Sequence, residues 1–382
     1  MHRSVLLIRN AAKDDFGGAE TYQVSLALIL KENQFNPIIV SRSKKLLSYS
    51  KKNNINTLRG WWWKRQNWNG VHLLLLPLYI VWQLILTVWY IYIIKKTTAI
   101  ALHVQSRDDF IAATLAGKIM GTPVVWTDHM DLRYIFQSIS LPLRNPVGKL
   151  VFFAAHLASR IILISDNEHN LVTSHFKHKG SLKKQITLIN NGVLDKILDM
   201  PERNDDKSFH FCLASRIVEN KGIGEAIKAF ILLQSRIEKP TDVKLDIYGD
   251  GEDLNKFKKL AENNTCITFH GHQDDAIEKI YQSGAFILPS YQEGFSIALL
   301  EATMLGKAII ASNIDSNPEI IHHKKTGLLI ETKSEHSLEE AMYALLNDSD
   351  LRLHLEKNAR QNFIDNYDLR KIVKEKIIPL YR

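Results

Sequence analysis

Two carboxylates stand eight positions apart in the stretch SYQEGFSIALLEA at residues 290–302, and no charged residue lies between them. Glu293 precedes a glycine, whereas Glu301 falls inside an apolar run that reads as a helix. Carboxylates are rarely buried without a partner, and an ionised carboxylate only accepts hydrogen bonds. A pair of ribose hydroxyls suits Glu301, and Glu293 can reach hydroxyls of a sugar. A structural ion pair with a lysine elsewhere in the chain is the alternative.

Two cations follow an expected strand in SRIVENKG at residues 215–222. Arg216 and Lys221 are five positions apart, at the strand end and in the following loop. Together they can neutralise a diphosphate, the arginine with its planar fork and the lysine as a point charge. The structural alternative is a pair of solvated cations, since exposed lysine and arginine are common.

Glycines and histidines supply two further candidates in the first half of the chain. Gly17 and Gly18 lie between an expected strand and an expected helix, where glycine permits close backbone approach and helix N–H groups favour phosphate. By itself such a pair is more often only a turn. His103 and His129 fall at the ends of two expected strands. A single histidine at a strand end is usually structural, but two at consecutive strand ends raise the expectation of a cleft role, and neither has metal-ligand spacing.

The elements that must position these residues alternate between short β-branched runs and helical patterns. Expected strands of the first half are 4–10, 36–42, 99–105, 123–129, 160–166 and 185–193, and those of the second half are 209–216, 244–252, 266–272, 285–290, 307–312 and 326–332. Such alternation predicts parallel sheets with helices on both faces, that is, an α/β fold of two Rossmann-like doubly wound domains. Ligands of such sheets bind at the carboxyl ends of the strands, so we expect the two domains to face a shared cleft.

The polar segment 198–208 is the expected linker between the domains. The predicted division is a first domain at 1–197, a second domain at 198–365, and a C-terminal helix at 366–382 that packs back on the first domain. The N-terminus reads as a strand and not as a signal peptide. The only cysteines, Cys212 and Cys266, argue against a disulfide framework and suit a reducing compartment.

The net charge of +8 is unevenly distributed, since residues 33–107 contain eleven Lys and Arg but no Asp or Glu. Within the basic segment 41–65, the block GWWWKRQNW sets cations among tryptophans, a combination that suits an anionic membrane surface. Nucleic acid is the rival partner, but no nucleic-acid motif accompanies the charge. A solvated basic face is the third interpretation.

Residues 71–94 form an apolar run that would extend about 36 Å as a helix, enough to cross a bilayer. A crossing would place residues 1–70 and 95–382 on opposite sides, although both parts are expected to build one site. We therefore expect a helix packed partly on the domain core with its remaining apolar surface facing lipid, as in a monotopic protein. A fully buried core helix is the alternative.

An ordered set of motifs then identifies a resemblance. The matching stretches are GGAE, TDH, ISDNEHNLV, INNGV, SRIVENKG, YGDGE, FHG, PSYQEGFSIALLEATMLGKAIIAS, PEII and TGLLI. They span nearly the whole chain, which resembles retaining glycosyltransferases of the two-Rossmann-domain GT-B fold, specifically glycosyltransferase family 4 of the group 1 type.

The resemblance implies roles for individual residues. Glu293, His129, Arg216 and Lys221 would be catalytic, with His129 near the transferred sugar and the two cations stabilising charge on the departing diphosphate. The implied donor-binding residues are Gly17, Gly18, Arg216, Lys221, Gly271, Glu293, Gly294, Phe295, Ser296 and Glu301. No metal and no cofactor other than the nucleotide diphosphate sugar is expected.

The implied activity is retaining transfer of a sugar from a nucleotide diphosphate to a lipid-linked or lipopolysaccharide- or capsule-type glycan, at the cytoplasmic face of the membrane. Two departures from the family pattern leave the donor open: Ser296 stands where glycine is common, and NIDSNPEII replaces a Gly-Gly stretch. A sugar-nucleotide epimerase of the same fold and a non-catalytic membrane-associated scaffold are the alternatives.

Overall fold

The computed structural model describes residues 3–10, 17–60, 75–127, 146–175, 182, 184–203, 208–273 and 275–382. The chain divides into two compact units. Unit 1 contains Met1–Asn191 together with Leu369–Arg382, and unit 2 contains Gly192–Asp368. The division therefore falls earlier than the polar segment 198–208, which lies inside unit 2.

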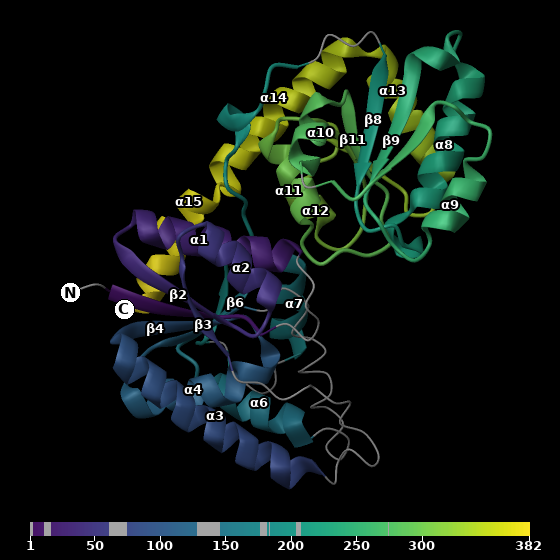
Figure 1. The fold of residues 1–382 in the computed structure, drawn as a ribbon. Helices are drawn as coiled ribbons and strands as arrows, with labels where there is room; N and C mark the ends of the chain where they lie inside the picture. The colour runs from purple at the N-terminus through teal and green to yellow at the C-terminus, as the bar shows by residue number, and fades with distance from the viewer. Residues whose placement is uncertain are drawn as a thin grey trace. The chain divides into compact units, whose positions relative to one another are not determined.

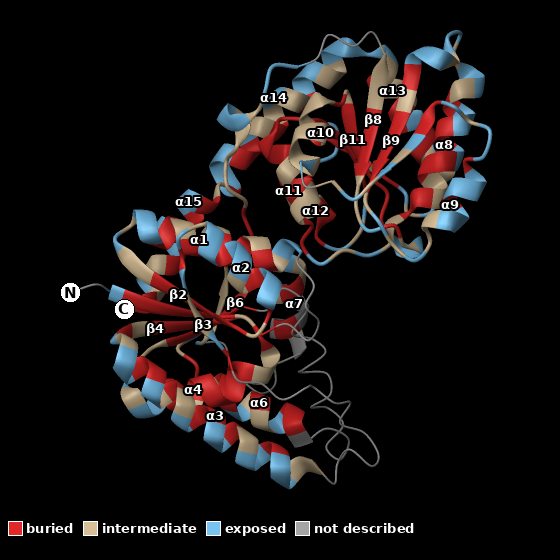
Figure 2. Cartoon of the chain, viewed as in Figure 1, coloured by how far each residue is buried: buried red, intermediate tan, exposed pale blue. Residues whose placement is uncertain are grey.

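Unit 1 is built on a parallel sheet that has seven strands within the described residues, in the order β3-β2-β1-β4-β5-β6-β7. The strands are β1 (Arg3–Ile8), β2 (Phe35–Ser41), β3 (Asn56–Arg59), β4 (Ala99–Val104), β5 (Val124–Thr127), β6 (Arg160–Leu163) and β7 (Ile186–Leu188). They are apolar on both faces except at the edges, as parallel strands covered by helices must be (Figure 2). The predicted α/β architecture is confirmed.

Helices cover both faces of this sheet (Figure 1). One face carries α3 (Leu76–Thr97), α4 (Phe110–Met120) and α6 (Pro146–Leu157), which share a core with Leu6, Val40 and Val104. The other face carries α1 (Gly18–Glu32) and α2 (Lys44–Lys52) (Figure 1). This distribution follows from right-handed crossovers, because the chain moves from β1 toward β3 in one direction and from β4 toward β7 in the other. A further helix of unit 1, α7 (Asp166–His175), follows β6.

The elements α2 and β3 were not predicted, because the lysines of this segment dominate its composition. α2 begins after Ser43, whose side chain accepts a hydrogen bond from the N–H of Leu46 at 3.1 Å. Leu46 and Ser50 face inward, while Lys51 and Lys52 are exposed at the helix end. The spacing of Leu46 and Ser50 and the serine cap were the available signals.

The segment 369–382 completes unit 1, as α15 (Leu369–Ile372), a π-helical turn (Val373–Ile377) and a 3₁₀ turn (Ile378–Tyr381). Tyr381 reaches the sheet, where its hydroxyl is hydrogen-bonded to His103 Nδ1 at 2.6 Å. The other ring nitrogen of His103 is hydrogen-bonded to Thr127 Oγ1 at 2.8 Å. Burial lowers the pKa of His103 to about 3. His103 is therefore a neutral core residue, and the expectation of a cleft role for it was wrong.

Unit 2 is a second parallel sheet, with six strands within the described residues in the order β10-β9-β8-β11-β12-β13. The strands are β8 (Phe209–Ala214), β9 (Val243–Tyr248), β10 (Ile267–Gly271), β11 (Ala285–Leu288), β12 (Ala308–Ser312) and β13 (Leu328–Ile330). On one face lie α8 (Ile223–Arg236), α9 (Leu254–Leu260) and α13 (Glu335–Asn347), and on the other α10 (Ala276–Gln282) and α11 (Ile297–Met304) (Figure 1). Two further helices are α12 (Asn317–Ile320) and α14 (Ser349–Asn366). Both cysteines of the chain, Cys212 and Cys266, are buried and unpaired.

Candidate functional site

The carboxyl edge of the second sheet brings together three of the predicted site residues. Arg216 follows β8, Lys221 lies in the 3₁₀ turn Glu219–Lys221 before α8, and Glu293 lies in the loop after β11. β8 and β11 are neighbours in the sheet, so both loops emerge at the same edge. The loops are also tied to each other, because the N–H of Tyr291 donates to the carbonyl of Asn220 at 2.8 Å.

Glycine is required where these two loops meet. Gly222 has a φ of +69° and lies at the start of α8. A Cβ at this position would lie 2.0 Å from the carbonyl oxygen of Pro289. Any other residue would push the Arg216–Lys221 loop away from the loop that carries Glu293.

Lys221 and Glu293 form a largely buried ion pair. The ammonium of Lys221 lies 2.7 Å from Glu293 Oε1, and the hydroxyl of Ser290 donates to the same oxygen at 2.7 Å. Glu293 therefore forms an ion pair with a lysine distant in the sequence, which was the alternative to a ligand-binding role. Within the described residues the second oxygen of Glu293 takes no hydrogen bond, and the exposed guanidinium of Arg216 makes none. These groups keep hydrogen-bonding capacity for a ligand.

The loop after β12 holds the backbone of Glu293 and Gly294. The N–H of Glu293 donates to Asp315 Oδ2 at 3.0 Å, and the Ser316 hydroxyl donates to the carbonyl of Gly294. Asp315 adopts a φ of +42°, a left-handed conformation that is unusual for a non-glycine residue. These side chains belong to the stretch that departs from the family's Gly-Gly pattern. In this chain they orient the Glu293 loop, which sequence reasoning did not foresee.

Glu301 lies inside α11, as the sequence predicted. Ser296 precedes the helix and its hydroxyl accepts the N–H of Leu299 at 3.4 Å, while Phe295 is buried beneath the loop. Burial raises the pKa of Glu301 to about 7, and the positive charge of Lys196 partly opposes that rise. Among the described residues no hydrogen bond or ion pair reaches this carboxylate. Glu301 is therefore a partly desolvated acceptor without a protein partner, the state expected of a ligand-binding carboxylate.

Two glycines with positive φ, Gly249 and Gly271, lie at the same edge of the second sheet. Gly271 ends β10 with a φ of +70°, and its carbonyl accepts the N–H of Gly249 at 2.8 Å. Gly249 has a φ of +134°, and a Cβ there would lie 1.8 Å from the carbonyl oxygen of Ser215. The YGDGE turn thus rests directly on the backbone just before Arg216.

A shared carboxylate links three neighbouring strands below this edge, and sequence reasoning missed it. Asp246 on β9 contacts His210 Nδ1 on β8 at 2.5 Å and His270 Nε2 on β10 at 2.7 Å. The ring of His270 stacks on Tyr248 with 4.5 Å between centroids. Burial alone would raise the pKa of Asp246, but the hydrogen bonds from the two histidines lower it below its ordinary value. Only the strand register brings these residues together.

Two further predicted site residues, Gly17 and Gly18, belong to unit 1. Gly17 and Gly18 begin α1, where the N–H of Gly17 donates to Glu20 Oε2 at 3.1 Å, and Glu20 also pairs with Arg9 at 2.9 Å. Because Gly17 and Gly18 belong to unit 1, their contribution to a donor site stays a prediction. His129 lies outside the described residues, as do residues 61–74 of the basic and apolar segments.

The carboxyl edge of the first sheet holds a second polar network that sequence reasoning missed. Asp109 is buried and accepts hydrogen bonds from Tyr90 at 2.7 Å, from Ser106 at 2.5 Å and from Asn10 at 3.0 Å. Burial raises the pKa of Asp109 above its ordinary value, although these three bonds oppose the rise. The network joins β1, β4 and α3, and thereby fixes α3 to the edge of the sheet.

One group within the described residues has the spacing of metal ligands, His336, Glu339 and Glu340 on α13. Both glutamates already pair with Arg236, at 3.0 Å and 2.7 Å. An Asp-x-Asp triplet at Asp348–Asp350 begins α14, where Asp348 accepts the N–H of Leu351 at 2.8 Å and so caps the helix. Glu339 and Glu340 are thus accounted for by ion pairing, and Asp348 by capping.

Two family models match the chain, one for each half. "Glycosyltransferase Family 4" matches residues 16–195, and "Glycosyl transferases group 1" matches residues 196–362. The second match contains Arg216, Lys221, Glu293 and Glu301.

The chain is also similar to relatives that are named as glycosyltransferases. An uncharacterised glycosyltransferase of Methanocaldococcus jannaschii is 31% identical over 60% of this chain, and an N,N'-diacetylbacillosaminyl-diphospho-undecaprenol alpha-1,3-N-acetylgalactosaminyltransferase of Campylobacter jejuni is 30% identical over 47%. The chain spans 59% and 46% of the lengths of these two relatives. An Escherichia coli UDP-Gal:alpha-D-GlcNAc-diphosphoundecaprenol alpha-1,3-galactosyltransferase is 28% identical over 76% of both chains.

Solved structures share the fold over the full length. A glycosyltransferase from Rickettsia africae superposes with a TM-score of 0.77 at 19% identity, covering 99% of this chain and 98% of that one. Anabaena HepE in complex with UDP superposes with a TM-score of 0.74 at 16% identity, covering 99% of each chain. With both halves matched by their family models and the two Rossmann-like sheets in place, the chain belongs to the GT-B glycosyltransferases of the group 1, family 4 type.

Proposed function

We propose that this protein is a retaining glycosyltransferase that moves a sugar from a nucleotide diphosphate donor to a lipid-linked or lipopolysaccharide- or capsule-type glycan. The observation that carries the proposal is the polar cluster at the carboxyl edge of the second sheet. There, two cations and two carboxylates with free hydrogen-bonding capacity lie on neighbouring loops and on α11. This combination suits a nucleotide sugar, because the cations can bind its diphosphate and the carboxylates can accept hydrogen bonds from its hydroxyls.

Each side chain has a proposed role set by its chemistry. Arg216 and Lys221 bind the diphosphate and stabilise the charge that grows on it as the glycosidic bond breaks. Glu301 accepts hydrogen bonds from the ribose hydroxyls, and Glu293 binds hydroxyls of the transferred sugar through its free oxygen. The ion pair to Lys221 orients Glu293 between the diphosphate and the sugar. His129 is proposed to lie near the transferred sugar.

The retaining course and the independence from metal belong to the same proposal. The acceptor would attack from the face that the diphosphate leaves, with the diphosphate held by side-chain cations instead of a divalent ion. The epimerase alternative requires an acid and base pair beside the sugar, and Glu293 with its ion pair to Lys221 does not offer one. A non-catalytic scaffold has no use for the carboxylate of Glu301, which has no hydrogen-bond or ion-pair partner among the described residues.

We further propose that the enzyme works on the cytoplasmic face of the membrane and contacts lipid through α3. The outer side of this helix is apolar, whereas a helix on a water-exposed surface has a polar outer side. Its inner side combines core residues such as Leu86 and Ile93 with hydrogen-bonding side chains. Outward side chains include Val88, which is 66% exposed, and Leu84, which is 56% exposed. The full outward set is Leu78, Ile80, Val81, Leu84, Ile85, Val88 and Tyr92.

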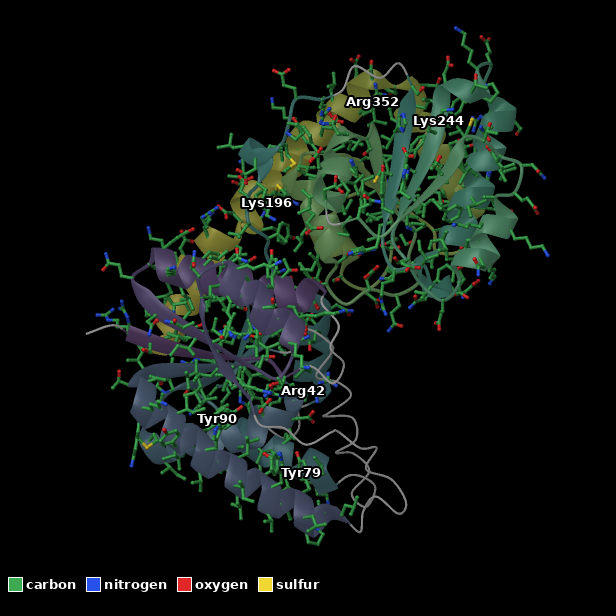
Figure 3. The ribbon with its side chains drawn as sticks, in the orientation of Figure 1. Arg42, Tyr79, Tyr90, Lys196, Lys244 and Arg352 are labelled. Carbon is green, nitrogen blue, oxygen red and sulfur yellow. The ribbon has the colours of Figure 1, made fainter. Side chains whose placement is uncertain are left out.

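The inner side of α3 carries the polar groups. Gln83 donates to the carbonyl of Asp108 at 3.1 Å, Thr87 to the carbonyl of Gln83 at 2.7 Å, and Tyr90 to Asp109. Figure 3 labels Tyr79 and Tyr90, both of which are buried. A helix that hides its hydrogen-bonding side chains and exposes aliphatic ones matches a hydrocarbon environment.

The helix lies in the membrane plane in this proposal and does not cross it. Leu76–Thr97 is long and apolar enough to span a bilayer by length and composition. However, β3 precedes it and β4 follows it, and both strands belong to one sheet. A crossing would divide that sheet, so burial of the outer side of α3 at the interface is the arrangement that keeps unit 1 whole.

The cations that accompany α3 are Lys95 and Lys96 at its end, both exposed. Within the described residues, the lysines of the basic segment are Lys44, Lys45, Lys51 and Lys52 on α2, which covers the opposite face of the sheet (Figure 1). A flat membrane against α3 cannot also contact α2. We therefore assign the lipid contact to α3 with Lys95 and Lys96, and do not extend it to α2.

Transfer itself is tested with purified protein and labelled acceptor. UDP-, GDP- and ADP-sugars are first screened by melting temperature, because a ligand that binds only the folded state raises it. The stabilising donor is then incubated with undecaprenyl-diphosphate-linked sugars, and the product is identified by mass spectrometry and by the anomeric coupling constant in NMR. We expect one donor class to raise the melting temperature and to give an α-linked product from an α-linked donor. Absence of stabilisation by every nucleotide would instead support the scaffold.

Lipid contact is tested by placing a charge on the outer side of α3. Val88→Glu is expected to lower binding to vesicles with anionic lipid by about tenfold or more, because a carboxylate in the hydrocarbon region costs several kcal/mol. Binding is measured by sedimentation with lipid vesicles at low salt. The matched control is Leu353→Glu on α14, where the leucine is 62% exposed in unit 2. Equal vesicle binding by the two variants would contradict the proposal.

A further inference from the structure

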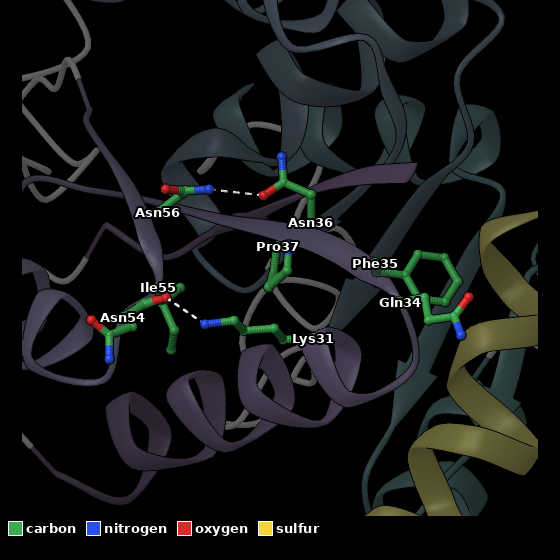
Figure 4. Close-up of a pocket in the computed structure, with 8 residues that line it drawn as sticks. All are labelled: Lys31, Gln34, Phe35, Asn36, Pro37, Asn54, Ile55 and Asn56. Carbon is green, nitrogen blue, oxygen red and sulfur yellow. Dashed lines mark hydrogen bonds between the residues drawn. The ribbon is translucent and has the colours of Figure 1, made fainter. Parts of the chain in front are cut away.

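Unit 1 contains a hollow of about 590 Å³ at the edge of the sheet opposite to the carboxyl ends (Figure 4). It is lined by Lys31, Gln34, Phe35, Asn36, Pro37, Asn54, Ile55 and Asn56. These residues come from the end of α1, the end of α2 and the first residues of β2 and β3. The volume falls within the range of small-molecule sites.

The lining is dominated by side-chain amides with hydrogen-bonding capacity left over. Asn56 donates to Asn36 Oδ1 at 2.8 Å, and Asn36 donates to Ser4 at 3.1 Å. Within the described residues, neither the amide of Gln34 nor that of Asn54 makes a hydrogen bond. Each amide offers two donors and one acceptor, which suits a ligand rich in hydroxyl groups.

Two helix ends bring these amides to the rim. Gln34 and Asn54 follow the C-terminal caps of α1 and α2, with φ values of +65° and +55°. Glycine is the usual residue at such positions, but here each carries an amide side chain that lines the hollow. Phe35 adds an aromatic ring to the same wall (Figure 4).

The electrostatics decide against an anionic ligand. The C-terminal ends of α1 and α2 both face the hollow and carry partial negative charge. The cation among the lining residues, Lys31, donates from its ammonium to the carbonyl of Asn54 at 3.0 Å, so its charge is directed to the end of α2. A phosphate or acidic sugar would meet these dipoles unfavourably, whereas a neutral polyol would not.

We infer that this hollow binds a neutral saccharide, as a second carbohydrate site on unit 1. In the context of the proposed function, on which this assignment of the ligand's source rests, the saccharide is a part of the acceptor glycan remote from the reacting end. The hollow lies at the amino ends of β2 and β3, whereas ligands of transfer in doubly wound sheets meet the carboxyl ends. The site would therefore retain a long acceptor without taking part in the reaction.

The test is titration with two neutral probes, N-acetylchitotetraose and maltotetraose, at millimolar concentration without any nucleotide. Side-chain amide signals of ¹⁵N-labelled protein are followed by NMR. At least one probe is expected to shift a set of these signals in a saturable manner. The combined variant Gln34→Gly and Asn54→Gly, which keeps both left-handed positions favourable, is expected to weaken this binding at least about tenfold. Gln361→Ala in unit 2, which removes an exposed amide paired with Asp365, serves as the matched control.

Three outcomes overturn the inference: no shift with either probe, equal binding by the double variant and wild type, or tighter binding of inorganic phosphate than of the sugars in the same titration. Because no donor is present, saccharide binding is independent of transfer. A protein that binds the probes but transfers no sugar would refute the proposed function alone. A protein that transfers sugar but ignores the probes would refute the second site alone.

Discussion

Glu301→Gln is expected to weaken nucleoside binding about tenfold and to stabilise the unliganded protein. The glutamine keeps one acceptor oxygen but loses the charge that strengthens hydrogen bonds from the ribose hydroxyls. It also removes a carboxylate that lies partly desolvated and, within the described residues, without a partner. Binding is measured by calorimetry with uridine, because the terminal phosphate of UDP titrates close to the same pH range.

The pH dependence of the two effects follows from the pKa of Glu301, which burial raises to about 7. Between the ordinary value of about 4.5 and 7, the folded state holds a proton that the unfolded chain has released. The contribution of Glu301 to stability therefore falls as pH rises through this window. Above pH 7 the difference in unfolding free energy between Glu301→Gln and wild type should approach about 3 kcal/mol.

Uridine affinity of the wild type should change in the opposite sense, rising with pH as the carboxylate ionises, while that of Glu301→Gln stays flat. Denaturant unfolding and uridine calorimetry at pH 5, 6, 7 and 8 test both trends. Glu262→Gln, an exposed glutamate of the same unit, is the control and should resemble wild type throughout. Parallel pH curves for wild type and Glu301→Gln would remove Glu301 from the ribose site.

Arg216→Ala is expected to lower UDP affinity by about 10- to 100-fold while leaving uridine affinity unchanged. The guanidinium is exposed and, within the described residues, makes no hydrogen bond, so its loss should cost the fold little. A charge-assisted hydrogen bond to a phosphate contributes about 1.5–3 kcal/mol. The UDP affinity of Arg216→Lys should fall between that of wild type and that of Arg216→Ala. Lysine keeps the positive charge but cannot form the two parallel hydrogen bonds of a guanidinium.

Lys258→Ala on α9 controls for the loss of an exposed positive charge from unit 2. Calorimetry with UDP and with uridine, at one salt concentration, separates the diphosphate from the nucleoside. The assignment of Arg216 fails if the variant loses affinity for both ligands equally, since that pattern indicates a change in the nucleoside site. It also fails if UDP affinity matches that of Lys258→Ala.

The fold was predictable from the sequence because its signals are local. Alternating β-branched runs and helical patterns specify parallel sheets, and Glu301 illustrates this, because its place inside a helix was predicted and is confirmed. The segment that forms α2 and β3 was missed because its helix shows only Leu46 and Ser50 as inward residues among many lysines. In this segment the many lysines obscured the helical spacing of the two inward residues.

The contacts within the site were less predictable, because they join residues distant in the chain. Lys221 and Glu293 are 72 residues apart in the sequence. The sequence predicts a diphosphate contact for Lys221 and a sugar contact for Glu293, but it does not predict the ion pair between them. Asp315 lies in the stretch NIDSNPEII, which departs from the family's Gly-Gly pattern, so no family motif predicts its hydrogen bond to Glu293. The contacts of Asp246 with His210 and His270 depend on the register of three strands, which no short stretch of sequence specifies.

The return of residues 369–382 to the first sheet has a consequence for biosynthesis. Tyr381 contacts His103 from 278 positions further along the chain, and the whole of unit 2 is translated between them. On the ribosome, unit 2 can complete its core while unit 1 still lacks a covering segment. In the nascent chain, part of the sheet of unit 1 therefore stays uncovered while unit 2 is synthesised. We expect chaperones to bind this exposed surface until residues 369–382 emerge from the ribosome.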